Sequence, residues 1–310
     1  MQYTTFSALE QQKILRYNVG LKNRESRFLF MTTPCVAAIH DMSGFGRCSL
    51  TVAIPVLSAM GVQCCPLPTA FLSTHTGGFE NFTFLDMTDE MPKVAAHWKS
   101  LGLRFRAVYS GFLGSERQIG IVEDFIRDFR TPECAVVVDP VMGDHGEVYQ
   151  TYTPAMCAGM ARLAEQADVI TPNLTEAALL LGIPYGSLPT GEDGCREIVE
   201  RLSLEGRRSV VLTGASTAPH LTGAMCFDAA TSRTEAVQTR RVEREFHGTG
   251  DVFASVLTGA LVHGHSLTEA AGQAVEFIRA CAERTAAEDL PLREGVDFEP
   301  LLGLLTGWHK

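Results

Sequence analysis

The feature that most constrains the fold of this chain is a regular alternation of short apolar runs with longer helical patterns. The apolar runs predict buried strands at residues 35–39, 62–65, 107–110, 135–139, 168–171 and 210–213. Helical patterns lie between and after them, at residues 50–60, 91–101, 115–129, 154–166, 176–181, 194–204, 251–263 and 267–287. Continuous apolar strands separated by helices indicate an α/β protein with a mostly parallel central sheet covered on both faces.

The sequence also predicts a hairpin late in the chain and an extension at its start. Residues 223–228 and 234–238 predict an antiparallel pair of strands at one edge of the sheet. Because no internal repeat or linker interrupts residues 31–310, we expect a single domain there. Residues 1–30 carry mixed charge without a signal-peptide hydrophobic region, and Met31 directly precedes the first strand. They are either an extension upstream of the true start or a loosely attached arm.

The composition excludes several classes of protein. A hydrophobic content of 45% with 20% charged residues is typical of a globular protein with a sizeable core. The net charge of −10 argues against a general nucleic-acid binder, which needs a basic face. No run approaches the roughly 20 apolar residues that cross a bilayer. The nine cysteines are scattered without a C-x-x-C pattern, which favours reduced thiols in a cytoplasmic protein.

Polar residues follow the predicted strands at the points where the strands end. In open α/β sheets, ligands gather beyond the carboxyl ends of the strands. The residues in question are His40, Asp41, Asp139, Thr171, Asn173, Thr213 and Gly214. Each one alone could be a helix cap or part of a turn, but their shared location predicts a common ligand cleft.

The strongest local motif is the segment 247–251, H-G-T-G-D, which leads directly into an apolar helical run. Gly248 and Gly250 let the backbone approach a ligand closely, and successive amides at a helix N-terminus form an anion cradle. Asp251 beside such a cradle could act as the general base of a phosphoryl transfer. In the alternative interpretation, Asp251 caps the helix and the glycines form a tight turn.

At this point the sequence resembles a known family. Residues 248–251 (G-T-G-D) are similar to the signature of ribokinase-like kinases, in which Gly248, Thr249 and Gly250 would form the anion hole and Asp251 would be the base. Residues 139–144 (D-P-V-M-G-D) and 171–176 (T-P-N-L-T-E) resemble the other motifs of that family, in the same order along the chain. The resemblance covers residues 35 to about 285 and implies a three-layer α/β/α sandwich that uses ATP.

The resemblance also implies where the nucleotide and its metal bind. Asp139, Asp144 and Glu176 would form an acidic set for Mg²⁺, acting largely through water molecules. The residues that would contact the nucleotide are Thr171, Asn173, Thr213 and Gly214. In the alternative, the three acids have separate local roles: a strand-end turn, a solvated loop and a charge at a helix N-terminus.

On the acceptor side, the segments are similar to those of pyridoxal kinases within the ribokinase-like superfamily. Residues 73–78 (S-T-H-T-G-G) resemble S-N-H-T-G, where Thr76 would reach the substrate ring. Residues 109–115 (Y-S-G-F-L-G-S) resemble S-G-Y-L-G-S, with Phe112 in place of tyrosine. The loop with His40 and Asp41 would contact the ring, and Asp41 stands where those kinases carry serine. Alternatively, His40 and Asp41 stabilise a turn and Phe112 is a core residue.

Four other functions remain as comparisons. A Rossmann dehydrogenase fits poorly, since Ser49 stands where the third glycine belongs and the second strand ends without the ribose-binding acid. A hydroxymethylpyrimidine kinase usually carries cysteine in place of Asp251, although residues 41–44 resemble its first loop. No sugar-gripping lid is visible between residues 40 and 110, and a ligand sensor would not need Asp251.

The sequence therefore predicts an ATP-dependent kinase that phosphorylates the hydroxymethyl group of pyridoxal, pyridoxamine or pyridoxine, the forms of vitamin B6. The resemblance further implies a homodimer and activation by a monovalent cation such as K⁺. The alternative acceptor is hydroxymethylpyrimidine.

Overall fold

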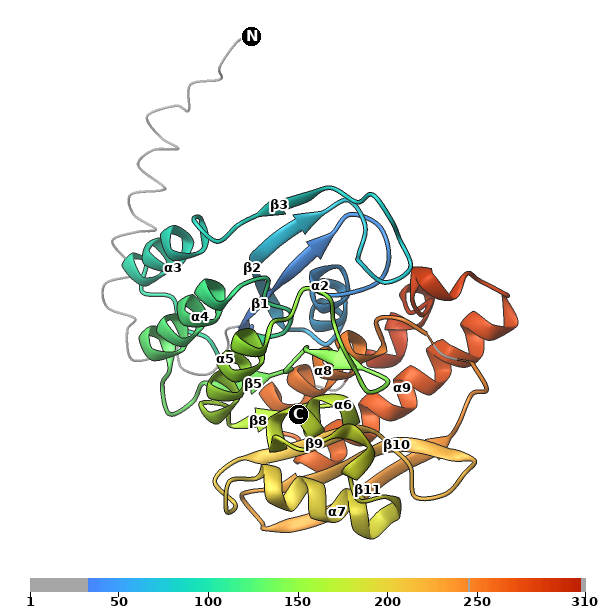
Figure 1. Cartoon of the computed structure of the whole chain (residues 1–310). Coiled ribbons are helices and arrows are strands. Elements are labelled where there is room, and N and C mark those ends of the chain that lie inside the picture. The colour runs from blue at the N-terminus through green and yellow to red at the C-terminus, as the bar shows by residue number, and fades with distance from the viewer. Residues whose placement is uncertain (1–32, 245, 308–310) are drawn as a thin grey trace, which may run out of the picture. The chain divides into compact units, whose positions relative to one another are not determined.

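The computed structural model describes residues 33–244 and 246–307 (Figure 1). The predicted extension at residues 1–30 lies outside this part of the chain. Over the described residues, no helix combines the length and the apolar character needed to cross a membrane. The nine cysteines all fall within the described residues, and all are free thiols.

A nine-stranded sheet forms the centre of the fold, in the order β11-β10-β9-β8-β5-β4-β1-β2-β3. Its strands are β1 Cys35–Ser43, β2 Gln63–Leu72, β3 Phe84–Asp86, β4 Ala107–Ser110, β5 Ala135–Val138, β8 Val169–Ile170, β9 Ser209–Ala215, β10 Leu221–Asp228 and β11 Arg233–Arg240. The strands from β2 to β9 in this order pair in parallel, while β10 and β11 form the antiparallel hairpin predicted for one edge.

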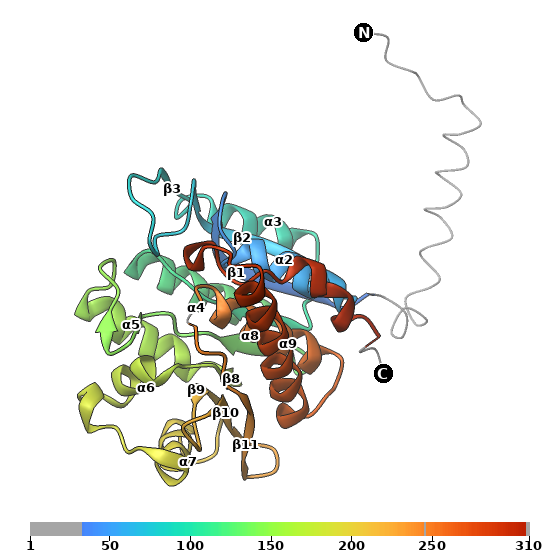
Figure 2. The same ribbon diagram turned by 90° about the vertical axis from the view of Figure 1, so that its right-hand side faces the viewer.

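Helices cover both faces of the sheet, as Figure 2 shows. One face carries α2 Leu50–Ala59, α8 Thr249–Val262 and α9 Leu267–Ala287. The other face carries α3 Met91–Ser100, α4 Glu116–Phe129, α5 Pro154–Glu165, α6 Leu174–Leu181 and α7 Gly191–Leu202. Each face has its own cluster of buried apolar side chains, because the strand residues alternate between the two faces. The predicted three-layer α/β/α architecture is confirmed.

Two strands are longer than the sequence predicts. β1 continues through His40 and Asp41 to Ser43, so residues predicted to form a loop are strand. β2 continues through Pro66 and Pro68, although proline usually marks the edge of a sheet. Its antiparallel partner β3 pairs with it only from residue 70 onward, so the prolines can face the uncovered side.

The connections place a topological switch between β1 and β4. From β1 the chain crosses through α2 to β2 on one side, and it then returns to β4 on the other side of β1. Crevices at such switch points, beyond the carboxyl ends of the strands, are the usual ligand sites of open α/β sheets. The fold therefore directs the search to the ends of β1 and β4.

Candidate active site

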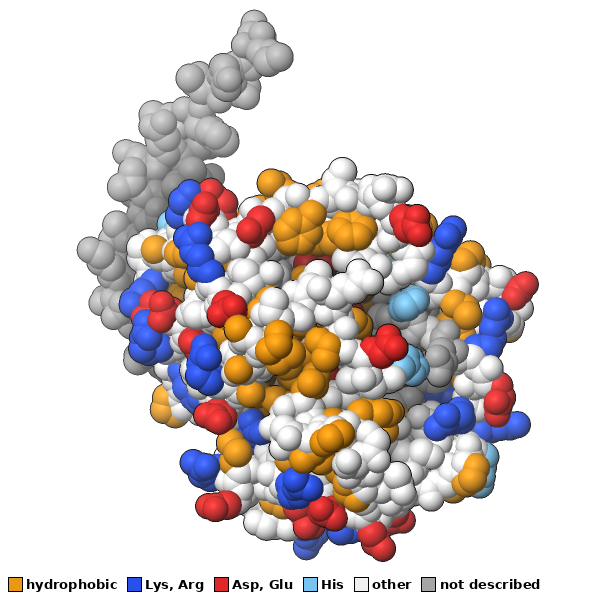
Figure 3. All heavy atoms as spheres, viewed as in Figure 1, with side chains coloured by type: hydrophobic (Ala, Val, Ile, Leu, Met, Phe, Trp, Pro, Cys, Tyr) orange, Lys and Arg blue, Asp and Glu red, His pale blue; other side chains and the backbone are white. Residues whose placement is uncertain are grey.

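Three polar side chains lie at the carboxyl ends of neighbouring strands, on the same face of the sheet. Asp139, Thr171 and Thr213 each stand two positions beyond a valine of β5, β8 or β9 that packs in the cluster with α2, α8 and α9. Since side chains alternate along a strand, all three turn toward the side on which α8 begins. The face viewed in Figure 3 is hollowed near its centre, and acidic side chains show at the bottom of the hollow.

The N-terminus of α8 directs its backbone amides toward these strand ends. Gly248 is the N-cap in a left-handed conformation, with φ of 74°, and glycine has no side chain with which to cap the helix. The first N–H groups of a helix have no partner within it, so the amides from Thr249 to Asp251 remain available to an anion. Asp251 lies inside the first turn, which excludes the alternative in which this residue is the helix cap.

Both the space around position 248 and the backbone angle at this position require glycine. A Cβ atom at this position would lie 2.0 Å from the carbonyl oxygen of Arg47. Gly250, by contrast, has open space where a Cβ would lie. The cradle is thus built against the loop that joins β1 to α2.

The carboxyl group of Asp251 sits in an acidic and desolvated environment. Burial raises its pKa to about 8, and the neighbouring charges of Asp139 and Asp41 add to the rise. The backbone amide of Ser49 nearby opposes the rise. The structure therefore brings together Asp251, Asp41 and Asp139, which are far apart in the sequence.

Ser49 is a site residue that the sequence presents only as a mismatch to the dinucleotide fingerprint. Its hydroxyl donates to Oδ1 of Asp41 at 2.6 Å, and its backbone amide lies beside Asp251, where it lowers the pKa of that carboxyl group. The Ser43 hydroxyl donates to the other oxygen of Asp41 at 3.2 Å. Asp41 is only 6% exposed, and burial raises its pKa despite these hydrogen bonds. The only signal in the sequence was the position of Ser49 immediately before a helix that follows a predicted site loop.

Two of the three predicted metal acids are buried beside each other. Oδ1 of Asp139 accepts from the Thr171 hydroxyl at 3.1 Å, and burial raises the pKa of Asp139 to about 7. Burial and the charge of Asp139 hold the pKa of Glu176 well above its usual value. Asp144 is exposed, and its Oδ1 accepts from the backbone N–H of His145.

The buried acids are positioned by the loops around them. Oε1 of Glu176 accepts from the Met142 N–H at 3.2 Å, and Oε2 accepts from the Asn173 N–H at 2.9 Å. Asn173 in turn caps α6, which makes the pair a capping box, and its Nδ2 donates to the Gly143 carbonyl at 2.9 Å. Among the described residues, no three or more His, Cys, Asp or Glu side chains are grouped as a metal site.

The raised pKa values predict how stability changes with pH. An unfolded aspartate has a pKa of about 3.9, so folded Asp139 binds its proton more tightly and the folded state loses stability as pH rises from about 4 to 7. Asp139→Asn should therefore gain melting temperature over the wild type increasingly across this window, measured without ligands. Asp89→Asn, at an exposed ion pair, is the control. A difference that stays constant with pH would show that Asp139 is not a buried charge.

Thr213 and Gly214 stand at the neighbouring end of β9. The backbone N–H of Thr213 donates to the Pro172 carbonyl at 2.9 Å, which joins this strand end to the segment that carries Asn173. Gly214 is exposed and has a φ of 68°. Both residues therefore lie at the same end of the strands as Asp139 and Thr171. Their contact with a nucleotide stays a prediction.

His40 does not lie on the surface of the hollow. Its side chain is fully buried, with the ring edge-on to Tyr109 at a centroid distance of 4.2 Å. A Cβ on Gly111 would meet the ring at 2.1 Å, so the chain at Gly111 passes directly over it. Burial lowers the pKa of His40 to about 3. The His40 ring is therefore not accessible in this structure, and its contact with an acceptor stays a prediction.

The other two predicted acceptor residues differ in exposure. Thr76 is exposed next to His75, whose Nε2 lies 2.6 Å from the Arg293 carbonyl and whose Nδ1 accepts from the Gly77 N–H. Phe112 is half-buried against the core and contacts Tyr152 edge-on at 6.1 Å. Phe112 therefore packs against the core, as the alternative interpretation of this residue expects.

Comparison with known proteins identifies the family. Residues 53–295 match the phosphomethylpyrimidine kinase family. The chain belongs to this family. Together with the fold described above, this membership makes the protein a kinase of the ribokinase-like superfamily, as the sequence predicts.

The relatives of this family member divide between two acceptors. It is 32% identical to the pyridoxine/pyridoxal/pyridoxamine kinase of Bordetella avium, over 76% of this chain and 80% of that protein. It is 31% identical to the hydroxymethylpyrimidine/phosphomethylpyrimidine kinase of Haemophilus influenzae, over 61% of this chain and 67% of that protein.

Solved structures are similar over most of the chain. A Bacteroides thetaiotaomicron protein crystallised with pyridoxal, and described provisionally as a phosphomethylpyrimidine kinase, is 44% identical with a TM-score of 0.83. The alignment covers 88% of this chain and 96% of that one. The pyridoxal kinase of Lactobacillus plantarum is 32% identical with a TM-score of 0.81, covering 88% and 97% of the two chains.

Proposed function

We propose that the protein transfers the γ-phosphoryl group of ATP to the hydroxymethyl group of a B6 vitamer, pyridoxal, pyridoxamine or pyridoxine. The observation that carries this proposal is the placement of Asp251 in the first turn of a helix whose N-cap is glycine, next to Asp139 and Asp41. A carboxylate and a row of free amides at one point are what an in-line phosphoryl transfer needs. The Bacteroides protein that was crystallised with pyridoxal supports the choice of acceptor.

Each part of this arrangement has a chemical task in the proposed reaction. Asp251 accepts the proton of the acceptor hydroxyl as its oxygen attacks the γ-phosphorus, and the bond from that phosphorus to ADP breaks. The amides from Thr249 to Asp251 stabilise the negative charge on the transferred group. Because the base must be unprotonated, kcat/KM of the free enzyme should fall as pH falls below about 8, the pKa of Asp251.

The acids beside the cradle fit Mg²⁺ bound largely through water. Asp139 and Glu176 are two buried carboxylates, and the charge of Asp139 raises the pKa of Glu176, so a bound cation would relieve unfavourable charge here. Both oxygens of Glu176 already accept backbone N–H groups, which leaves few direct ligand positions. When bound, Mg²⁺ supplies positive charge that neutralises the ATP phosphates.

Hydroxymethylpyrimidine is the second candidate acceptor, and Asp41 is the residue that favours it. A buried carboxylate held by two serine hydroxyls at the end of β1 can accept a hydrogen bond from a ring amino group or a protonated ring nitrogen. The matching family and the Haemophilus relative act on pyrimidines by name. Both candidate acceptors are heteroaromatic rings with a hydroxymethyl group, so the same Asp251 would serve either.

A panel of acceptors tests the choice directly. The purified protein is incubated with MgATP and pyridoxal, pyridoxamine, pyridoxine or hydroxymethylpyrimidine, and ADP and the phosphorylated product are both measured. We expect the highest kcat/KM with a B6 vitamer. A clear preference for the pyrimidine would transfer the proposal to the second candidate. Binding of the acceptors without any product would support a ligand sensor instead.

A further inference from the structure

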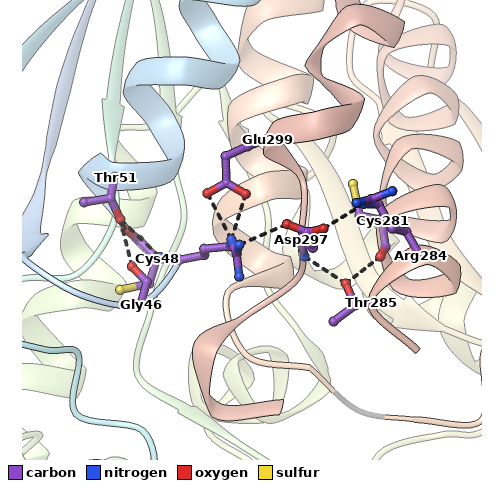
Figure 4. Close-up of polar contacts among 9 residues, drawn as sticks. Gly46, Cys48, Thr51, Cys281, Arg284, Thr285, Asp297 and Glu299 are labelled. Atoms are coloured by element: carbon purple, nitrogen blue, oxygen red, sulfur yellow. Dashed lines mark hydrogen bonds and ion pairs between the residues drawn. The ribbon is translucent and has the colours of Figure 1, made fainter. Parts of the chain in front are cut away.

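The loop between β1 and α2 is fastened to the C-terminal part of the chain by one arginine. Nε of Arg47 donates to both carboxylate oxygens of Glu299, at 2.9 and 2.8 Å, and Nη2 donates to Oδ1 of Asp297 at 2.9 Å. Figure 4 shows these dashed contacts meeting between Glu299 and Asp297. The arginine and Asp297 are separated by 250 positions in the sequence, so the contact joins opposite ends of the domain.

Asp297 is itself held rigidly from its other side. Its Oδ2 accepts from Nε of Arg284 at 2.7 Å, and its backbone N–H donates to the Thr285 hydroxyl at 2.8 Å (Figure 4). Thr285 donates to the Cys281 carbonyl at 2.6 Å, within α9. The Asp297 side chain is 11% exposed. A carboxylate that is buried and shared between two guanidinium groups is a fixed anchor, unlike a single ion pair at the surface.

The backbone of Arg47 forms part of the wall of the anion cradle. Its carbonyl oxygen lies only 2.0 Å from the position that a Cβ atom on Gly248 would take. Its N–H donates to the Glu294 carbonyl at 3.0 Å, which fastens the main chain as well as the side chain. Two residues further on, the backbone amide of Ser49 lies close enough to Asp251 to lower the pKa of its carboxyl group. The same short segment therefore lies against the cradle glycine and beside the proposed base.

We propose that Arg47 is a positioning residue for phosphoryl transfer, which holds the loop of residues 47–49 against Gly248 and Asp251 through its pairing with Asp297 and Glu299. The inference rests on the proposed function for its catalytic consequence, although the ordering of the cradle can be measured without any acceptor. Arg47 itself touches neither nucleotide nor acceptor in this account. Its removal should therefore affect the alignment of Asp251 and the amides more than it affects substrate affinity.

Kinetic measurements test this role against a matched control. Arg47→Ala should lower kcat by about 10²-fold, the usual cost of a misplacement of about 1 Å, with a smaller change in acceptor KM. Arg47→Lys keeps the charge but loses the two-oxygen contact, so it should recover part of the rate. The control is Arg279→Ala, because Arg279 also pairs with two carboxylates, Glu276 and Glu283, on the surface of α9. This variant should retain the wild-type kcat.

Hydrogen exchange separates a failure of this inference from a failure of the proposed function. Without ligands, Arg47→Ala should speed exchange of the backbone amides in residues 47–51 and 246–252, while Arg279→Ala should not. If Arg47→Ala fails to fold, Glu299→Gln provides the same comparison with a milder change. Unchanged exchange and unchanged kcat in folded Arg47 or Glu299 variants would overturn the inference. Faster exchange in a protein that phosphorylates none of the acceptors would overturn the proposed function alone.

Discussion

Replacing Asp251 with asparagine is expected to lower turnover by about 10²–10⁴-fold, the usual contribution of a positioned general base. Asparagine has nearly the shape of aspartate but cannot take the proton of the acceptor hydroxyl. The backbone amides of the first turn of α8 do not depend on this side chain, so binding of ADP should change little. Steady-state kinetics with the best acceptor and calorimetric titration with ADP measure the two quantities.

The pH profile provides an independent check on the same residue. Wild-type kcat/KM should rise with pH through an ionisation near 8, because burial and the charges of Asp139 and Asp41 raise the pKa of Asp251. The residual activity of Asp251→Asn should lack this ionisation. Asp228→Asn, in the hairpin of β10 and β11, is a control that should match the wild type. A variant at position 251 with full activity would remove the base from the account.

The second large effect is expected from Gly248→Ala. Its φ of 74° lies in the left-handed region, where a side chain costs about 1–2 kcal/mol, and the new Cβ would lie 2.0 Å from the Arg47 carbonyl oxygen. Relieving such a clash by moving backbone adds about 1–3 kcal/mol. The free energy of unfolding should fall by the sum of these terms, and turnover should fall as well because the loop and the cradle are pushed apart.

Gly250→Ala is the matched control for this change. A Cβ at position 250 meets no atom within 4 Å, and the residue has a helical conformation, so alanine should leave the stability unchanged or higher. Chemical denaturation of both variants compares the two glycines in one experiment. Equal stability of the Gly248 and Gly250 variants would show that the loop of Arg47 does not press on the cradle in solution.

Most of the fold followed from local sequence patterns, and the exceptions have physical causes. The apolar runs that became β4, β5, β8 and β9 are buried on both faces, so their strand character is visible from composition alone. The extension of β1 through His40 and Asp41 was not visible, because polar residues read as a loop. Pairing with β2, which runs alongside it as far as Ser43, makes this segment a strand.

The candidate site was predicted in its residue types but not in its connections. The segment of residues 248–251 could be located from its glycines, whereas the choice between base and cap for Asp251 depended on the residue at which α8 begins. The sequence also offered Glu176 as a charge at a helix N-terminus, and the structure places it in the first turn of α6. The part of Glu176 in Mg²⁺ binding, the homodimer and the activation by a monovalent cation stay predictions.

The contacts that the sequence could not reveal join distant segments. Ser49 reaches Asp251, and Arg47 reaches Asp297 and Glu299, across most of the length of the chain. No periodicity or spacing relates such residues, because only the assembled sheet brings the β1–α2 loop, the start of α8 and the segment after α9 together. The proposed positioning role of Arg47 is therefore an inference from structure alone.

The most direct measurement is a crystal structure of the protein with pyridoxal, ADP and Mg²⁺. The account predicts that the hydroxymethyl oxygen of pyridoxal lies within about 2.6–3.2 Å of an Asp251 carboxylate oxygen, on the side from which it can attack along the line of the cradle amides. Pyridoxal bound with its hydroxymethyl group turned away from Asp251, or at another part of the sheet, would contradict it.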